Sequence, residues 1–222
     1  MIPNAIPAPL NILYQDEIIV AVDKPAGQMV TPPANKKPDD QITMKILRDQ
    51  IGSRVHPIHR LDRPTSGVLL FSTNKDAARK LHAAFENHEV TKTYWAIVSG
   101  QPSWKKRTSH EPLKKDDSLK SLPAQTEFRV IELLNHNLSL IEAKPKTGRF
   151  HQIRRHILHL GHPIVGDYRY AGIDRSNQLG NLLHTGTRML LQSVSLQLQH
   201  PATNAELTIE APTDPLIQKL RP

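Results

Sequence analysis

The sequence predicts an α+β protein built on a large, mostly antiparallel sheet. Segments with the composition of strands outnumber segments with helical periodicity. Most of the strand-like segments are neighbours joined by short polar turns, as in antiparallel hairpins. Neither an internal repeat nor a sharp change of composition divides the 222 residues. We therefore expect one domain over residues 1–222, long enough to bury a core without disulfides.

Turn residues and apolar alternation define the strands. A first hairpin is expected over 12–14 and 18–22, ended by Pro25 and Gly27. The other strands are expected over 68–72, 89–100, 125–134, 138–145, 188–201 and 205–212. In the segment 89–100, alternation places Lys92 and Tyr94 on one face, and Tyr94 is by default a core or cross-strand aromatic.

Three segments have helical periodicity. The first covers 41–51, with Asp40 as a possible N-cap, and the second covers 74–88. The third is predicted from apolar residues at spacings of three, four and three, with Thr147 as N-cap: Phe150, Ile153, Ile157 and Leu160. Residues 1–10 are expected to form a loose lead-in, 101–124 a surface loop and 168–186 another loop.

The composition points to a polyanionic partner. Lys and Arg number 29 against 21 Asp and Glu, a formal charge of +8, although solubility alone is an alternative reason for this excess. With no cysteine, the chain has no disulfide, thiolate zinc site or cysteine nucleophile. Aromatic residues are only 5% of the chain, so RNA binding would depend on one or two key aromatics. Because no leader or membrane-length apolar segment is present, we expect a soluble, cytoplasmic protein.

The stretch HRLDRPTSGVLLFS places one carboxylate, Asp62, between Arg60 and Arg63. A lone Asp before such a turn is more often a turn acceptor than a catalyst. Against that reading, Arg60 and Asp62 project to the same side of an extended chain, and the following buried strand gives the loop a rigid base. Neighbouring cations keep an acid ionised, which suits a nucleophile or a base.

A second polar group follows at 149–155, where three arginines lie within seven residues: Arg149, Arg154 and Arg155. These arginines indicate either the solvated face of an amphipathic helix or a phosphate clamp at the entry to a helix. Either interpretation leaves Arg154 able to pair with an acid. The histidines of this region lack an accompanying acid at metal-ligand spacing, so we do not expect a metal site, and no nucleotide-cofactor motif is present.

Four blocks together resemble the RluA family of pseudouridine synthases. HRLDRPTSGVLLFS is similar to that family's H-R-L-D-x-x-T-S-G signature, and VDKPAGQMV, KTYWAIVSG and KTGRFHQIRRHILHLGHPIVGD resemble its other blocks, in the same order. The resemblance covers nearly the whole chain and is greatest to the tRNA pseudouridine(65) synthase subgroup. It implies a pseudouridine synthase fold, with a mixed, mostly antiparallel sheet across two lobes, flanking helices and a central cleft. No S4-like module is expected ahead of the catalytic part.

The same resemblance implies roles for individual residues. Asp62 would attack C1′ of the ribose or abstract the C2′ proton, Arg154 would orient Asp62 and keep it ionised, and Tyr94 would stack on the target base. Arg60 would enter the RNA where the nucleotide is flipped out. The remaining substrate or RNA contacts would be His59, Arg63, Thr65, Lys92, Arg149, His151, Gln152 and Arg155. The reaction is an isomerisation, so it requires no cofactor, metal or energy source.

The expected partner is RNA, with tRNA favoured over ribosomal RNA. A catalytically silent RNA-binding module on the same scaffold is the alternative from another class, although pure binding would not require Asp62, Tyr94 and Arg154 together. We expect a monomer. The family often has L-H-A near the end, where this chain has Leu191, Gln192 and Ser193, so the role of that histidine has no candidate here.

Overall fold

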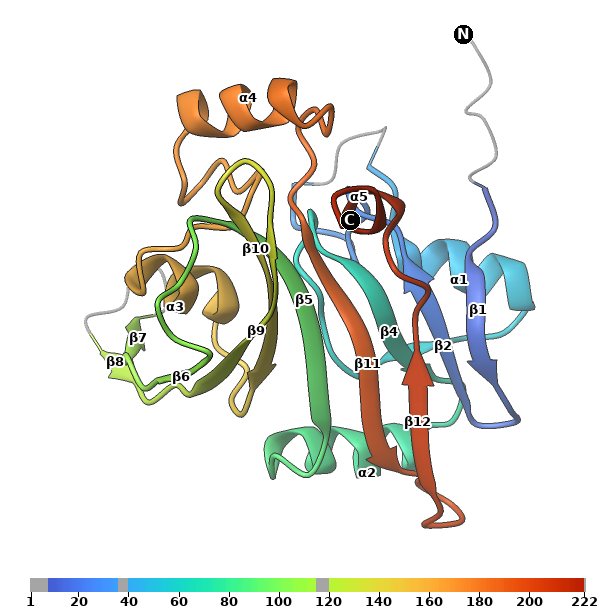
Figure 1. Cartoon of the computed structure of the whole chain (residues 1–222). Coiled ribbons are helices and arrows are strands. Elements are labelled where there is room, and N and C mark those ends of the chain that lie inside the picture. Colours follow the sequence, from blue (N-terminus) through green and yellow to red (C-terminus); the bar gives the residue numbers. More distant parts are fainter. Residues whose placement is uncertain (1–7, 36–39, 115–119, 222) are drawn as a thin grey trace, which may run out of the picture.

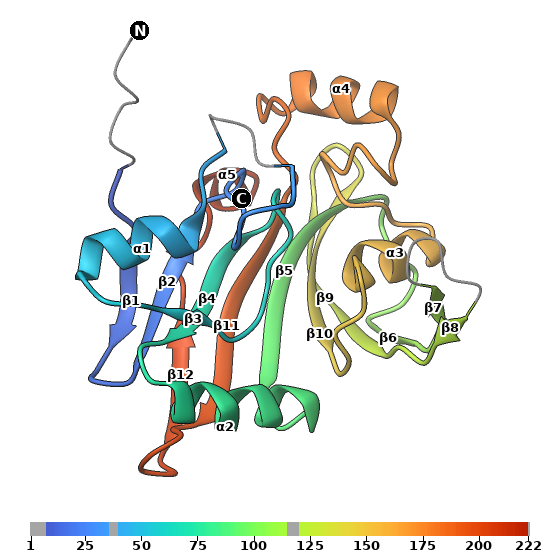
Figure 2. The ribbon, with the colours of Figure 1, turned by 180° about the vertical axis from the view of Figure 1, so that it is seen from behind.

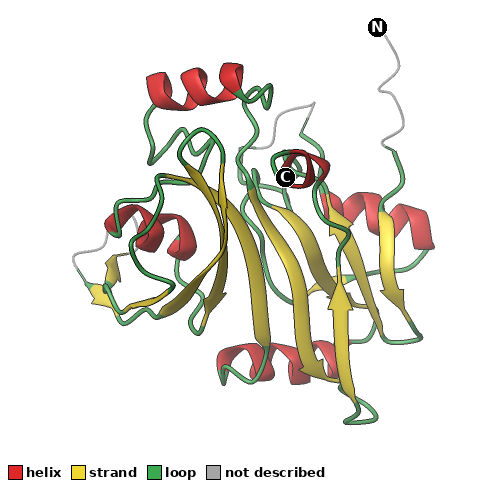
Figure 3. Ribbon diagram, viewed as in Figure 1, coloured by secondary structure: helices red, strands yellow, loops and turns green. Residues whose placement is uncertain are grey.

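A ten-stranded sheet forms the centre of the computed structural model, which describes residues 8–35, 40–114 and 120–221 (Figure 1). The main path runs β1-β2-β4-β11-β5-β10-β9-β6, with β12 beside β11 and β3 beside β4. These strands are β1 (Asn11–Gln15), β2 (Ile19–Lys24), β3 (His56–Pro57), β4 (Ser66–Ser72), β5 (Thr91–Ser99), β6 (Lys106–Ser109), β9 (Thr126–Leu134), β10 (Leu138–Pro145), β11 (Leu191–Gln199) and β12 (Glu206–Glu210). Among the described strands of this sheet, only β4 and β11 pair in parallel. The predicted α+β class is confirmed, and Figure 3 shows how far strand dominates over helix.

In the described part of the chain, five helices pack around this sheet: α1 (Thr43–Ile51), α2 (Lys75–Glu86), α3 (Gln152–His159), α4 (Ile173–Leu182) and α5 (Pro215–Lys219). Figure 2 shows α1 and α3 on one face of the sheet, on either side of β4, β11 and β5. In the same view α2 crosses the lower end of the sheet and α4 stands above its upper edge. The central strands are therefore flanked by helices on one face, with the loop that precedes β4 passing between α1 and α3.

The centre of the sheet is buried on both faces. Every residue of β4 is buried, as are most of β2, which explains their continuous apolar runs. Gly67 lets β4 approach β11, because a Cβ at this position would lie 2.1 Å from the Ser193 carbonyl oxygen. Its φ of +105° is also a conformation that only glycine adopts without strain. The TSG sequence thus brings two strands together that lie more than a hundred residues apart.

The prediction of a surface loop over 101–124 is wrong for much of this segment. β6 pairs with β9 and extends the large sheet, while β7 (Leu113–Lys114) and β8 (Ser121–Leu122) form a second, two-stranded sheet. Three of the four side chains of β6 are exposed, so the strand lacks apolar alternation. Charged side chains are typical of edge strands, where they discourage pairing with other chains. Residues 115–119, and residues 1–7 of the expected lead-in, lie outside the described part.

The prediction of a loop over 168–186 is also wrong, because α4 lies inside it. Only Ser176 and Gly180 are buried in this helix, and its apolar ends Ile173 and Leu182 are 65% and 53% exposed. An apolar stripe at helical spacing is therefore missing from the sequence. Gly180 permits close packing, since a Cβ there would lie 2.2 Å from the carbonyl oxygen of Gly186.

Neither predicted N-cap is used. α1 begins at Thr43 after an extended Ile42, and backbone carbonyls of the preceding loop replace Asp40 as acceptors: Thr43 N–H donates to Met29 at 2.8 Å and Met44 N–H donates to Val30 at 3.2 Å. Free N–H groups at a helix start need some acceptor, and here a neighbouring segment provides it.

α3 begins at Gln152, so Phe150 precedes the helix and is 42% exposed instead of buried. Its N-cap position is His151, which is left-handed at φ 51° and makes no side-chain cap. The hydroxyl of Thr147 instead donates to the side-chain oxygen of Gln152 at 2.6 Å. The predicted buried face is right for Ile153 and Ile157.

Candidate active site

A cavity of about 610 Å³ opens where the loop before β4, the end of α2, strand β5 and the segment leading into α3 meet. Ten of the twelve predicted site residues line it: His59, Arg60, Asp62, Thr65, Lys92, Tyr94, Arg149, His151, Gln152 and Arg154. The cavity receives residues from both sides of strand β11, because Asp62 precedes β4, Tyr94 lies on β5, and β11 lies between these two strands. Leu191 at the start of β11 contributes part of the apolar wall.

The loop that carries Asp62 is held at several points. Leu61 is buried beneath it, and the Asp62 carbonyl accepts a hydrogen bond from Thr65 N–H at 3.0 Å. Arg63 joins the loop to the segment after β2: its carbonyl accepts from Gly27 N–H at 2.7 Å, and its Nε donates to the Gly27 carbonyl at 2.9 Å. The Asp62 carboxylate is therefore presented on a rigid turn, with 28% of its side chain exposed toward the cavity.

Lys24 supports the same loop from below. Its side chain is completely buried, and Nζ donates to the carbonyls of Pro25, Gln28 and Arg63 at 2.8, 2.9 and 3.3 Å. Burial, followed by the charge of Arg188, lowers the pKa of Lys24 to about 7. The lysine of VDKPAG therefore acts as a structural donor that ties the two loops together.

Arg154 is shared by two carboxylates. Its Nε and Nη2 donate to Asp167 at 2.8 Å each, and its Nη1 donates to Asp62 Oδ2 at 3.0 Å. Asp167 is 1% exposed, and its Oδ1 also accepts from Tyr170 N–H at 3.3 Å, so the carboxylate is held inside the protein beside the arginine. One guanidinium between two carboxylates leaves a net charge of −1 on the three groups. Arg154 is thus fixed by Asp167 and orients Asp62 without fully neutralising it.

His151 forms the third side of this cluster. Its Nε2 lies 3.7 Å from Asp62 Oδ2, and its Nδ1 is 3.0 Å from the hydroxyl of Tyr170. The ring stacks on Phe150 with 3.7 Å between centroids. Burial, with a smaller contribution from Arg154 among other charges, lowers the pKa of His151. A neutral imidazole leaves the negative charge of Asp62 in place.

Tyr94 lies on the β5 wall of the cavity and is 8% exposed. Burial, together with the charge of Asp62, raises the pKa of Tyr94 to about 12. The phenol therefore stays protonated at neutral pH and offers an aromatic surface and a neutral hydroxyl. A ring of this kind beside a carboxylate is suited to holding a planar base.

Comparisons with known proteins agree with this geometry. Residues 18–159 match the family model for RNA pseudouridylate synthase. Proteins named tRNA pseudouridine synthase C are similar over almost the full length: that of Pasteurella multocida is 40% identical, covering 92% of each chain, and that of Vibrio parahaemolyticus is 37% identical, covering 96% of this chain and 94% of the relative. The chain belongs to the RNA pseudouridylate synthase family.

Solved structures of the family support the fold. The human protein RNA Pseudouridylate Synthase Domain Containing 1 superposes with a TM-score of 0.79 at 27% identity, covering all of this chain and 89% of that one. Domain Containing 4, also human, superposes with a TM-score of 0.74 at 26% identity, covering 95% and 92%. This pseudouridine synthase is an isomerase that converts uridine to pseudouridine.

Two predicted contacts of the synthase lie away from the cavity lining. Arg63 is directed to Gly27, with its Nη1 3.5 Å from Asp40, and Arg155 donates to the Lys114 carbonyl at 2.7 Å. Gln152 lines the cavity but is buried, and all its amide atoms are engaged inside the protein. Its Oε1 accepts from Thr147 and Arg149, and its Nε2 donates to Gln125 and Thr126. Gln152 therefore holds the segment before α3 against the start of β9, and its amide has no N–H left to donate to RNA.

Asp167 and Tyr170 are site residues that the sequence reasoning missed. The RNA pseudouridylate synthase block ends at GHPIVGD, so Asp167 was inside the recognised motif. Gly166 marks the position, because it has a φ of +76° and a Cβ would lie 1.9 Å from the Arg188 carbonyl. A glycine required by close packing, directly before an acid, is the signal in the sequence that could have identified Asp167.

No group of three or more His, Asp and Glu in the described ranges could hold a metal ion. Across the same residues, no helix is long and apolar enough to cross a membrane.

Proposed function

We propose that this synthase acts on tRNA, as a single catalytic domain in the cytoplasm, and that Asp62, Arg154 and Tyr94 perform the reaction. The observation that carries this proposal is the Asp62 carboxylate, held 3.0 Å from Arg154 in a cavity whose other wall is Tyr94. The name shared by the similar bacterial proteins, tRNA pseudouridine synthase C, supports tRNA as the substrate class. Neither a metal nor a cofactor has a part in the proposed chemistry.

The reaction breaks the bond between N1 of uracil and C1′ of ribose and joins C5 to C1′. Asp62 begins it, either by attacking C1′ or by removing the C2′ proton. The released uracil anion then turns within the cavity and C5 bonds to C1′, as the Asp62 oxygen leaves C1′ or the proton returns to C2′. The C5 proton leaves and N1 gains a proton, so substrate and product are isomers. Because Arg154 is committed to buried Asp167, it keeps the Asp62 oxygen oriented throughout these steps.

Tyr94 keeps the detached base in the cavity. Its raised pKa of about 12 means that the ring acts as a neutral stacking surface in the ground state. The residue lines the same cavity as Asp62, where a base released from C1′ would meet it. Stacking without fixed hydrogen bonds allows the base to rotate, because every face of a pyrimidine offers a π surface.

Cations at the cavity mouth would receive the RNA. Arg60 is exposed beside Asp62, and Arg149 stands at the opposite segment, where its Nε donates to the Pro123 carbonyl at 3.1 Å. A flipped nucleotide costs about a few kcal/mol of unstacking, which contacts of this kind offset. Arg60, next to the catalytic loop, is the side chain we propose to occupy the space left in the RNA.

The test is pseudouridine mapping of tRNA and ribosomal RNA from cells lacking this gene, with the wild-type gene and Asp62→Asn returned separately. We expect one tRNA position to lose pseudouridine, the wild type to restore it and Asp62→Asn to fail. Loss of pseudouridine from ribosomal RNA alone would overturn tRNA as the substrate, whereas the proposed reaction at Asp62 would still stand. Binding of tRNA by the purified protein without any change in pseudouridine would favour a silent RNA-binding module.

A further inference from the structure

Lys92 is a mostly buried lysine whose ammonium lies over an aromatic ring. Its residue is 9% exposed, and its Nζ lies 5.9 Å from the centre of the Phe85 ring. Within the described ranges, no hydrogen-bond acceptor or carboxylate pairs with this ammonium. Glu86 lines the same cavity but forms no ion pair with it. Burial, followed by the charge of Lys146, lowers the pKa of Lys92.

Lys92 faces the same cavity as the reacting groups. It lies two residues before Tyr94 on β5, so both side chains project from one face of the strand. Two residues along a strand cover about 6.6 Å, which is comparable with the reach from the base of a nucleotide to its own phosphate. Both residues line the cavity with Asp62. A nucleotide whose base meets Tyr94 would therefore bring its backbone near Lys92.

The neighbours of Lys92 do not supply a negative charge. His59 stacks on Phe85 with 5.0 Å between ring centroids, and its Nε2 accepts a hydrogen bond from Leu70 N–H at 3.2 Å. Burial, with the charge of Lys92, lowers the pKa of His59 to about 3, so this ring stays neutral. Because no carboxylate of the described residues faces this ammonium, an anionic ligand would gain most from it. The anionic group that RNA carries is its phosphate.

We propose that Lys92 binds the backbone phosphate of the nucleotide that enters the cavity, next to the ribose on which Asp62 acts. The inference rests on the proposed function and adds to it a phosphate subsite on the β5 side of the cavity. Its occupant is one RNA phosphate diester, and the contact is made by an ammonium that no carboxylate of the described residues pairs with.

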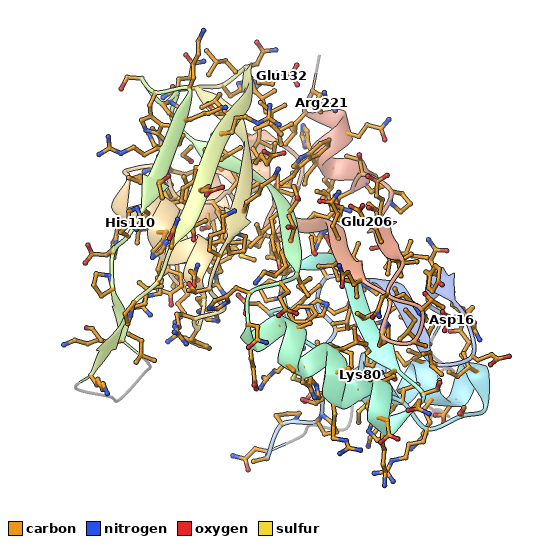
Figure 4. The ribbon with its side chains drawn as sticks, turned by 90° about the horizontal axis from the view of Figure 1, so that it is seen from below. Asp16, Lys80, His110, Glu132, Glu206 and Arg221 are labelled. Carbon is orange, nitrogen blue, oxygen red and sulfur yellow. The ribbon has the colours of Figure 1, made fainter. Side chains whose placement is uncertain are left out.

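The first test compares Lys92→Met with Lys80→Met. Lys80 lies on α2, labelled in Figure 4, and its Nζ donates to the Pro201 carbonyl at 2.9 Å, away from the cavity lining. Binding of purified bulk tRNA is measured over a range of salt concentrations. We expect Lys92→Met to reduce the slope of log Kobs against log salt by about 0.7–0.9, the value for one phosphate contact, and Lys80→Met to leave it unchanged. A wild-type slope for Lys92→Met would overturn the proposal.

The second test places the contact on the RNA. A tRNA stem-loop with the modified uridine receives a single neutral methylphosphonate, either 5′ or 3′ to that uridine. We expect one of the two to weaken wild-type binding while leaving Lys92→Met unaffected. Equal losses in both proteins, or no loss at either site in the wild type, would overturn the subsite. If Lys92→Met fails to fold, Lys92→Arg is expected to keep the wild-type response to each methylphosphonate.

These readouts are separate from the proposed function. Wild-type protein that forms pseudouridine in tRNA while Lys92→Met keeps the full salt slope would leave the function in place and remove the subsite. Wild-type protein that forms none would remove the function, and the salt slope would still report whether Lys92 contacts a phosphate.

Discussion

Replacing Asp62 and Asp167 with asparagine, one at a time, separates the residue that reacts from the residue that holds the site in place. Both carboxylates bind the same guanidinium, Arg154, and both substitutions remove one negative charge while keeping the side chain's shape. They differ in burial, since the Asp62 side chain is 28% exposed and that of Asp167 is 1% exposed. The structure therefore predicts that Asp62→Asn mainly lowers the rate and that Asp167→Asn mainly lowers the stability.

For Asp62→Asn, we expect a stability loss of about 1 kcal/mol, because Arg154 keeps both hydrogen bonds to Asp167 and the asparagine oxygen still accepts from Nη1. In a protein of this size that is a fall in Tm of roughly 2–4 °C. Turnover should fall below detection, because an amide neither attacks C1′ nor removes a proton. The affinity for tRNA should change little.

For Asp167→Asn, the bidentate contact with buried Arg154 loses its charge. Removing one partner of a buried pair costs about 3–5 kcal/mol, and the lower figure applies here because Asp62 still faces the arginine. We expect Tm to fall by roughly 6–12 °C. Because Arg154 is then less well held, the rate should fall by about 100-fold without being abolished.

The rate is measured as release of tritium from tRNA labelled at C5 of uridine, since the new C5 to C1′ bond displaces that hydrogen. Stability is measured by thermal unfolding, and binding by filter retention of the same tRNA. A near-normal rate for Asp62→Asn would refute its catalytic role. A larger loss of Tm for Asp62→Asn than for Asp167→Asn would refute the division of Arg154 between an exposed and a buried acid.

Three further substitutions test the frame around the site. Lys24→Met should remove three hydrogen bonds, to the carbonyls of Pro25, Gln28 and Arg63, and destabilise the Asp62 loop by about 3 kcal/mol, seen as a Tm lower by roughly 6–12 °C; an unchanged Tm would contradict the anchoring role. Gly67→Ala should prevent β4 from meeting β11, so little soluble folded protein is expected on gel filtration, and a normal yield would show that the strands can separate. Gln192→Leu should unpair the Pro212 carbonyl, which its Nε2 contacts at 2.6 Å, and Asp214 N–H, whose bond to Oε1 is 2.9 Å. The C-terminal segment should then exchange amide hydrogens faster, whereas wild-type protection of residues near 214 would contradict this.

Sequence motifs were sufficient to place Asp62, Tyr94 and Arg154 around one cavity, although 92 residues separate the acid from its arginine. The motifs carry this information because each lies where the local sequence restricts the backbone conformation. These places are a turn that ends at Gly67, a strand with alternating faces, and the start of a helix. The strand pairs β1–β2, β9–β10 and β11–β12 were predictable for the same reason, since short turns join them.

The missed features depend on contacts that no local pattern encodes. The second partner of Arg154 is 13 residues away, on a loop, and the acceptors that replace Asp40 at α1 come from residues 29 and 30. Edge strand β6 and helix α4 lack an apolar face, so periodicity could not reveal them. The departure at Leu191, Gln192 and Ser193 also became interpretable only in three dimensions, where Gln192 ties the C-terminal segment to β11.

The position of β11 determines when, during synthesis of the chain, the active site can assemble. β4 and β5 are neighbours in the chain but not in the sheet, and the strand between them comprises residues 191–199. A ribosome that has released only the first 180 residues has therefore exposed Asp62, Tyr94 and Arg154 without the strand that sets their separation. Folding must wait for this late, long-range insertion, which favours slow assembly. A truncated product would carry all three reactive side chains and still be unable to modify RNA.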